Sequence, residues 1–234
     1  MSAILKRDLQ SYFTSPLGYV FMAAYLVIMN AAFYVTTIMT GKNNLVNVYS
    51  IMMYALMILV PILTMRTFSE DYKQRTDQLL LTSPVKPIGI VLGKFLAAYL
   101  VFLFSLIFTV LQVLIVSAVG NVNMAVVFGN YIAILSVASV YIAIGVFVSS
   151  LTESQLVAAI ATLAINVALL LFDFAYELIN LSWVRSIIYW VSLYRRYNTF
   201  YVGVFSVADF FYYLSAAAVF IFLTVRILEK KRWS

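Results

Sequence analysis

The residues that could do chemistry are few, and they gather in one polar stretch. The longest run of mixed acidic and basic side chains lies between Arg66 and Pro87, where Glu70 and Asp71 are adjacent. Neighbouring positions on a helix point to different faces, so these two carboxylates do not converge on one substrate. The chain has no His and no Cys, which removes imidazole bases, thiolate nucleophiles and nearly all zinc or haem ligation. We therefore expect no catalytic centre on this chain.

A phosphate-binding loop is the other chemical motif to consider. Gly89 and Gly93-Lys94 give a glycine, a second glycine and a lysine in order. Their spacing is wrong for a P-loop, and the Ser or Thr that reaches the magnesium ion is missing. We reject this segment as a nucleotide site, so any ATP-driven work must take its energy from another subunit.

The composition points to lipid as the solvent. Hydrophobic residues make up 65% of the 234, and charged residues 10%, against roughly 25% charged in an average soluble domain. A soluble chain of this size cannot bury so much apolar surface, because its core is limited by surface-to-volume scaling. This excludes a soluble enzyme, a disordered chain and a nucleic-acid-binding domain. The net charge of +6 is better explained by membrane orientation than by nucleic acid.

Apolar runs of about 20 residues are long enough to cross a bilayer as helices. The charge-free run from Phe95 to Thr152 is too long for one crossing, and its Gly120-Asn123 segment has the chemistry of a tight turn. We predict one all-α transmembrane domain over 1–234. Its six spans are predicted at 17–39, 45–65, 89–118, 126–150, 155–172 and 207–226.

Residues 1–14 alternate apolar and polar side chains at helical spacing. This pattern predicts a short amphipathic helix on the membrane surface, with a frayed tail as the alternative. If this end is cytoplasmic, six spans place both termini there, and 11 of the 15 basic residues face the cytoplasm, as the positive-inside rule requires. These are Lys6, Arg7, Arg66, Lys73, Arg75, Lys86, Lys94, Arg226, Lys230, Lys231 and Arg232.

The stretch 66–87 then lies on the cytoplasmic side. Thr67 and Glu70 have the spacing of a capping box, and Asp71 with Arg75 forms an acid-then-base pair four residues apart. The two prolines Pro84 and Pro87 end the helix. We predict a helix over 67–82 that offers one face to a partner; an ordinary amphipathic connector is the alternative.

Residues 176–204 form neither a clean span nor a polar loop. They are rich in Trp and Tyr, with arginines among them, a composition typical of the membrane interface. We expect short re-entrant or interfacial helices on the outer side. They form an outer gate or partner face, or else a plain aromatic belt. The candidate residues for the gate or face are Trp190, Arg195, Arg196 and Tyr197.

Segments 68–71, 75–85 and 91–94 closely resemble the permease subunits of type 2 ABC exporters, the ABC-2 family, and most of all its gliding-motility, GldF-like branch. Weaker similarities at 149–160, 192–215 and 228–233 extend the resemblance to essentially the whole chain. In that family the loop after the second span carries the coupling helix. The resemblance therefore implies that the following residues couple the chain to an ATPase: Glu70, Asp71, Arg75, Thr76, Leu79 and Leu80.

The resemblance also implies a half-transporter in the plasma membrane of a bacterium. A second permease subunit, identical or a close paralogue, would pair with it, and cytoplasmic ATP-binding subunits would hold ATP and Mg. No cofactor is expected on this chain. The alternative function is a mechanical subunit that relays ATP-driven motion to an extracytoplasmic accessory protein without moving a solute. An integral membrane enzyme has little support, because His, Cys and a carboxylate cluster are lacking.

Overall fold

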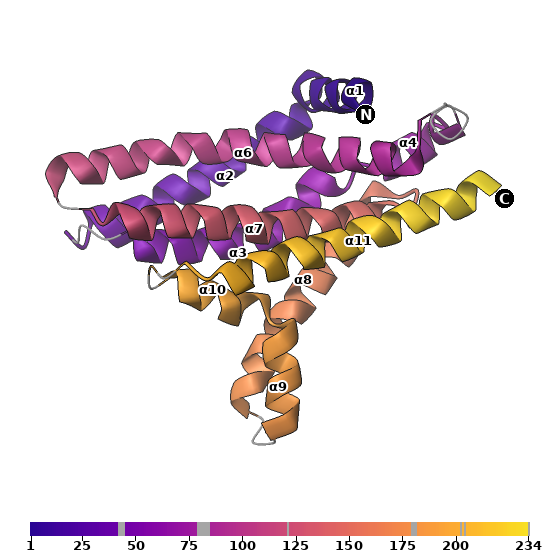
Figure 1. Cartoon of the computed structure of the whole chain (residues 1–234). Coiled ribbons are helices and arrows are strands. Elements are labelled where there is room, and N and C mark those ends of the chain that lie inside the picture. The colour runs from indigo at the N-terminus through magenta and orange to yellow at the C-terminus, as the bar shows by residue number, and fades with distance from the viewer. Residues whose placement is uncertain are drawn as a thin grey trace.

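The computed structural model describes residues 1–41, 45–78, 85–120, 122–178, 182–201, 203 and 205–233. Every regular element in these ranges is a helix (Figure 1). The elements are α1 (Ser2–Thr14), α2 (Pro16–Phe33), η1 (Tyr34–Ile38), α3 (Val46–Thr64), α4 (Ser69–Lys73), α6 (Pro87–Val119), α7 (Met124–Ser149), α8 (Gln155–Leu178), α9 (Ser182–Val191), α10 (Leu193–Tyr201) and α11 (Val207–Trp233).

Six helices are long and apolar enough to cross a membrane, which confirms the predicted all-α fold class with six spans. They cover Pro16–Ile38, Val46–Lys73, Pro87–Val119, Met124–Ser149, Gln155–Tyr176 and Val207–Arg232. The first of them ends in the π-helical turn η1. Between the third and fourth, Asn123 starts α7 by accepting a hydrogen bond from the amide of Ala125 at 3.1 Å, as an N-cap residue does.

Helix α7 is the centre of the bundle. It packs against α3, α6, α8, α10 and α11, and Figure 1 shows it running alongside α3, α6 and α11. Small residues allow these close approaches, since small side chains let membrane helices come together. At Gly145 a Cβ atom would lie 2.0 Å from Oγ1 of Thr64 in α3. The α3–α7 contact therefore depends on the absence of a side chain at this position.

Helix α1 lies across the first turns of α6, next to α2 (Figure 1). At Gly93 a Cβ atom would come within 3.1 Å of Ile4, so the glycine sets how closely α1 approaches α6. Ser15 is extended, and Pro16 begins α2, because its fixed φ suits the first helical position. Tyr12 is buried, and its hydroxyl donates to the carbonyl of Leu63 at 3.0 Å. Apolar packing and a buried hydrogen bond thus hold α1 on the bundle.

The predicted helix over 67–82 is interrupted, so the single continuous helix was wrong. Helix α4 ends at Lys73, and Arg75 has a φ of 57°, a left-handed conformation that breaks a right-handed helix. The capping box does not form either, since the hydroxyl of Thr67 donates to the carbonyl of Thr64. Residues 77–78 are helical again. Leu79 and Leu80 lie outside the described residues.

The connector over 176–204, which was predicted to lie on the outer side, contains two short helices, α9 and α10. Helix α10 packs against α7, α8 and α3, near the end of the bundle opposite α4 (Figure 1). Helix α8 starts in the bundle, against α3 and α7, and its later part projects from the bundle with α9 packed on it, as an arm. The two helices of the connector therefore have different surroundings, since α10 is packed into the bundle and α9 stands outside it.

Candidate functional site

The segment from Arg66 to Thr76 is anchored to the end of α7 by one serine. The amides of Phe68 and Ser69 both donate to Oγ of Ser149, at 3.0 and 3.1 Å, and that hydroxyl donates to the carbonyl of Met65 at 3.2 Å. Ser69 and Ser149 are both fully buried. One side chain therefore satisfies two amides where the chain leaves α3, and it fixes the start of α4 against α7.

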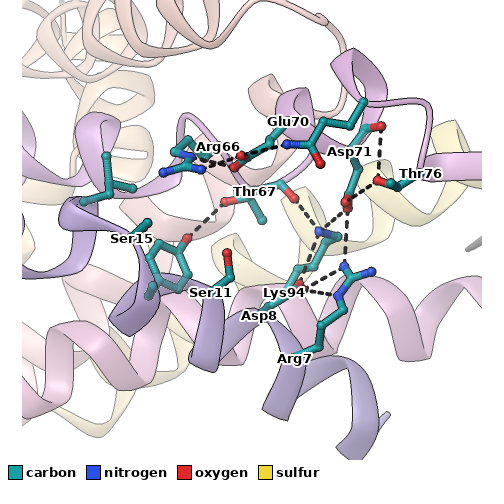
Figure 2. Close-up of a pocket in the computed structure, with 13 residues that line it drawn as sticks. Arg7, Asp8, Ser11, Ser15, Arg66, Thr67, Glu70, Asp71, Thr76 and Lys94 are labelled. Atoms are coloured by element: carbon teal, nitrogen blue, oxygen red, sulfur yellow. Dashed lines mark hydrogen bonds and ion pairs between the residues drawn. The ribbon is translucent and has the colours of Figure 1, made fainter.

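A buried ion cluster joins α4 to α6 and α1 (Figure 2). The ammonium of Lys94 lies 2.6 Å from a carboxylate oxygen of Asp71 and 3.2 Å from one of Asp8. It also donates to the carbonyl of Thr67. Arg7 completes the cluster, 2.7 Å from Asp8 and 3.5 Å from Asp71. Only 3% of the Lys94 side chain is exposed, so this charge is compensated inside the protein, as a buried cation must be.

A second contact ties α4 to α11. The ammonium of Lys231 lies 3.5 Å above the ring of Tyr72, within the range of a cation–π interaction. Tyr72 in turn stacks on Phe68, with ring centroids 6.2 Å apart. Helix α4, with one and a half turns of its own, is therefore attached to four longer helices: α1, α6, α7 and α11.

The structure brings two of the predicted coupling residues, Asp71 and Thr76, into contact. Asp71 accepts a hydrogen bond from the Thr76 hydroxyl at 2.9 Å, and Glu70 forms an ion pair with Arg66 and accepts from Gln74. The predicted pairing of Asp71 with Arg75 was wrong, because Asp71 faces Lys94. Arg75 is exposed. Sequence reasoning missed Lys94, Asp8, Arg7 and Ser149.

The outer candidates separate into buried and exposed residues. Arg196 lies 2.8 Å from Asp209 and 4.0 Å above the ring of Tyr212. Tyr197 is 1% exposed and donates to Oδ1 of Asn130 at 3.1 Å. These two residues therefore hold α10 inside the bundle and are not available as a partner face.

Trp190, by contrast, is 69% exposed on α9. Arg195 is half-buried and lies 3.7 Å above the ring of Tyr176. Of the four predicted outer residues, Trp190 alone has the exposure that contact with a partner or lipid requires.

The contacts of the α4 site are ion pairs and hydrogen bonds that fix its position on the bundle. In the part of the chain that the structure covers, no three His, Cys, Asp or Glu residues are grouped to hold a metal ion. What the α4 site offers is a short segment at one end of the bundle, held by buried ion pairs and hydrogen bonds.

One of two comparisons with known proteins places the chain in a family. A search of curated proteins finds no match. The model of a family described as ABC-2 family transporter protein matches residues 61–230, which include α4, the ion-cluster residues Asp71 and Lys94, and the later spans. The family is a membrane component of ABC transporters and not itself catalytic, and it works in general with an ATP-binding subunit. This match and the six apolar helices show that the chain belongs to the ABC-2 family and is the multi-pass permease component of an ABC transporter.

Proposed function

We propose that this permease is an exporter subunit, driven by a separate cytoplasmic ATPase that docks on the segment 67–82. The observation that carries the proposal is the attachment of α4 to α1, α6, α7 and α11. A segment bonded to four helices is a suitable point for a partner to apply force. Glu70, Arg75, Leu79 and Leu80 are the proposed contacts, whereas Asp71 and Thr76 hold the segment in place.

The proposed transmission uses two discrete arrangements of packed helices. ATP binding closes the partner ATPase, which shifts α4, and the buried contacts pass that shift to the spans. Packed interfaces respond to such a push by switching between arrangements, because close-packed cores do not deform continuously. Lys94 carries the shift to α6, and Ser149 carries it to α7.

The remaining partners follow from the same proposal. A second permease subunit, identical or a close paralogue, completes the transport path, and ATP with Mg binds to the ATPase subunits. The termini and α4 face the cytoplasm of a bacterium, and the turn after α6 faces outward. The gliding-motility, GldF-like branch is the proposed relationship within the family.

A second candidate function is a mechanical subunit that moves an extracytoplasmic partner without transporting a solute. The observation that favours it is the arm made by α8 and α9, which projects from the bundle (Figure 1) and exposes Trp183 and Trp190 at 65% and 69%. Exposed tryptophans on a projecting element suit contact with lipid or with another protein.

The coupling proposal is tested by co-purification of the full chain with its ATPase. Leu79→Asp together with Leu80→Asp should abolish the association, because charge replaces apolar contact. Leu151→Asp is the matched control, since Leu151 is an exposed leucine (58%) in the turn between α7 and α8. Retention of the ATPase by the double variant would reject the docking site.

Transport in vesicles then separates the two candidate functions. The purified complex should move solute when ATP is supplied if it is an exporter. ATP turnover that responds to the permease, without movement of any of a panel of amphipathic and peptide solutes, would favour the mechanical subunit.

A further inference from the structure

A polar cavity lies between α1 and the segment 66–76 (Figure 2). Its volume is about 350 Å³, within the range of about 300–1,000 Å³ typical of small-ligand sites. It lies where α1 meets the first turns of α6. The residues that line it are Arg7, Asp8, Ser11, Tyr12, Ser15, Leu17, Arg66, Thr67, Glu70, Asp71, Gln74, Thr76 and Lys94.

The charges in this lining balance. The three cations are two guanidinium groups and the ammonium of Lys94, and the three anions are the carboxylates of Asp8, Glu70 and Asp71. An anion such as free phosphate gains no net attraction from a neutral lining, and a simple cation gains none either. A ligand that carries both signs can place each against its opposite, so the lining favours a zwitterion.

Hydrogen-bond donors remain for the negative part of such a ligand. Arg66 uses Nε and Nη2 on Glu70, and its Nη1 is not engaged in any bond with the residues described. The hydroxyls of Ser11 and Ser15 also make no hydrogen bond within the described ranges, although both residues line the cavity. Guanidinium and hydroxyl donors are the groups that bind phosphate oxygens.

The positive part of the ligand is specified by what the lining lacks. A quaternary ammonium is recognised by a cage of aromatic rings, and Tyr12 is the single aromatic side chain among the described residues of the lining. A primary ammonium instead donates hydrogen bonds to carboxylates, which Glu70 offers at 23% exposure and Asp8 at 13%. The lining therefore fits ethanolamine better than choline.

The position of the cavity indicates where the ligand comes from. Helix α1 packs its apolar side on the bundle, leaves Lys6, Gln10 and Ser11 exposed, and leads directly into the first span at Pro16, which places the cavity at the end of a membrane span. Leu17, in the first turn of the first span, also lines the cavity. We propose that this cavity binds a phosphoethanolamine group, presented as the headgroup of a membrane lipid.

The test measures lipid retention by the full chain without any ATPase, so it is independent of the coupling proposal. Native mass spectrometry of the chain from nanodiscs of mixed phosphatidylethanolamine, phosphatidylcholine and phosphatidylglycerol should show selective retention of phosphatidylethanolamine. Ser11→Ala with Ser15→Ala should lower that retention at least about tenfold, since two hydrogen bonds to a charged group are lost. Ser117→Ala, at an exposed serine near the far end of α6, should leave it unchanged.

Glycerophosphoethanolamine, added to chain held in pure phosphatidylcholine, distinguishes the two sources of the group. Binding much weaker than that of the lipid supports the membrane source, whereas equal binding overturns it and assigns a soluble ligand of the same chemistry. Equal retention of the three lipids, or retention that the double alanine variant leaves unchanged, would overturn the site itself. Either result would make the retained lipid part of the general lipid shell.

Discussion

The ammonium of Lys94 lies 2.6 Å from a carboxylate oxygen of Asp71, and this ion pair joins α6 to α4. The Lys94 side chain is 3% exposed and the Asp71 side chain 15%. Asp8 from α1 meets the same ammonium at 3.2 Å. Three segments that are distant in the sequence thus share one buried cation. The pair is therefore a direct contact between α4 and the third span.

Lys94→Met should destabilise the protein by about 3 kcal/mol, because it leaves two carboxylates without the buried cation that compensates them. Thermal unfolding in detergent measures the loss. Lys6→Met, at an exposed position on α1, is the matched control and should have little effect. In the double variant with Asp71→Asn the cost should be smaller than the sum of the two single changes, since the residues interact. Additive costs would argue against the pair.

Gly145→Ala should destabilise the bundle by about 1–3 kcal/mol, since the new methyl group would meet Thr64 in a well-packed interface. Thr64→Gly in the same chain should restore part of that loss by removing the atoms that clash. Gly129→Ala in the same helix is the control, because nothing lies within 4 Å of the position that its new methyl group would take. It should be neutral or raise the stability by up to about 1 kcal/mol. Equal losses for both alanine variants would contradict the proposed contact.

Arg196→Met should lower the free energy of unfolding by about 3 kcal/mol, because it leaves the buried carboxylate of Asp209 without its cation. Both side chains are less than a tenth exposed. The exposed ion pair Arg226–Glu229 lies on α11, the helix that carries Asp209, and serves as the comparison. Arg226→Met should cost no more than about 1 kcal/mol, since exposed ion pairs contribute little. Unfolding monitored at both ends of the bundle would reveal the difference, and equal costs would contradict the role of Arg196 as an internal anchor.

The hold on α1 should weaken in alkali. Burial raises the pKa of Tyr12 to about 12, against about 10 for a tyrosine in an unfolded chain. A raised pKa favours the neutral hydroxyl in the folded state, so this stabilisation is complete below pH 10 and is lost as the pH rises toward 12. Wild type should exceed Tyr12→Phe by about 1 kcal/mol at pH 8 and fall below it near pH 12. Parallel stability curves for the two proteins would contradict this expectation.

The architecture could be predicted from the sequence because lipid imposes one strong rule. Each crossing needs about 20 apolar residues with its backbone hydrogen bonds satisfied internally, so the apolar runs indicated all six spans. The predicted coupling helix was wrong at Arg75, which has a left-handed backbone conformation. The residue types around Arg75 do not indicate that conformation. The local spacing indicated that Asp71 would pair with a basic residue, Arg75. It could not indicate that Lys94, from a later helix, would be the partner instead.

The buried polar contacts were harder to predict, because their partners are far apart in the chain. Lys94 was counted as one of the basic residues that set orientation, although it stands beside a charge-free apolar run. A cation in that position must find anions as the helix packs, and Asp8 lies on α1, whose approach to α6 is set by Gly93 and Ile4. Likewise, the sequence left Arg196 available to a partner, because nothing in it indicated that α10 packs in the bundle with Arg196 paired to Asp209.

The contacts of α1 also impose an order on biogenesis. Tyr12 finds its acceptor, the carbonyl of Leu63, 51 residues later in the chain, and Asp8 finds Lys94 at the start of the third span. Helix α1 leaves the ribosome before α6, so its binding surface is incomplete until α6 has entered the bilayer. During synthesis its apolar face must wait at the lipid surface, and its docking then marks the assembly of the first half of the permease.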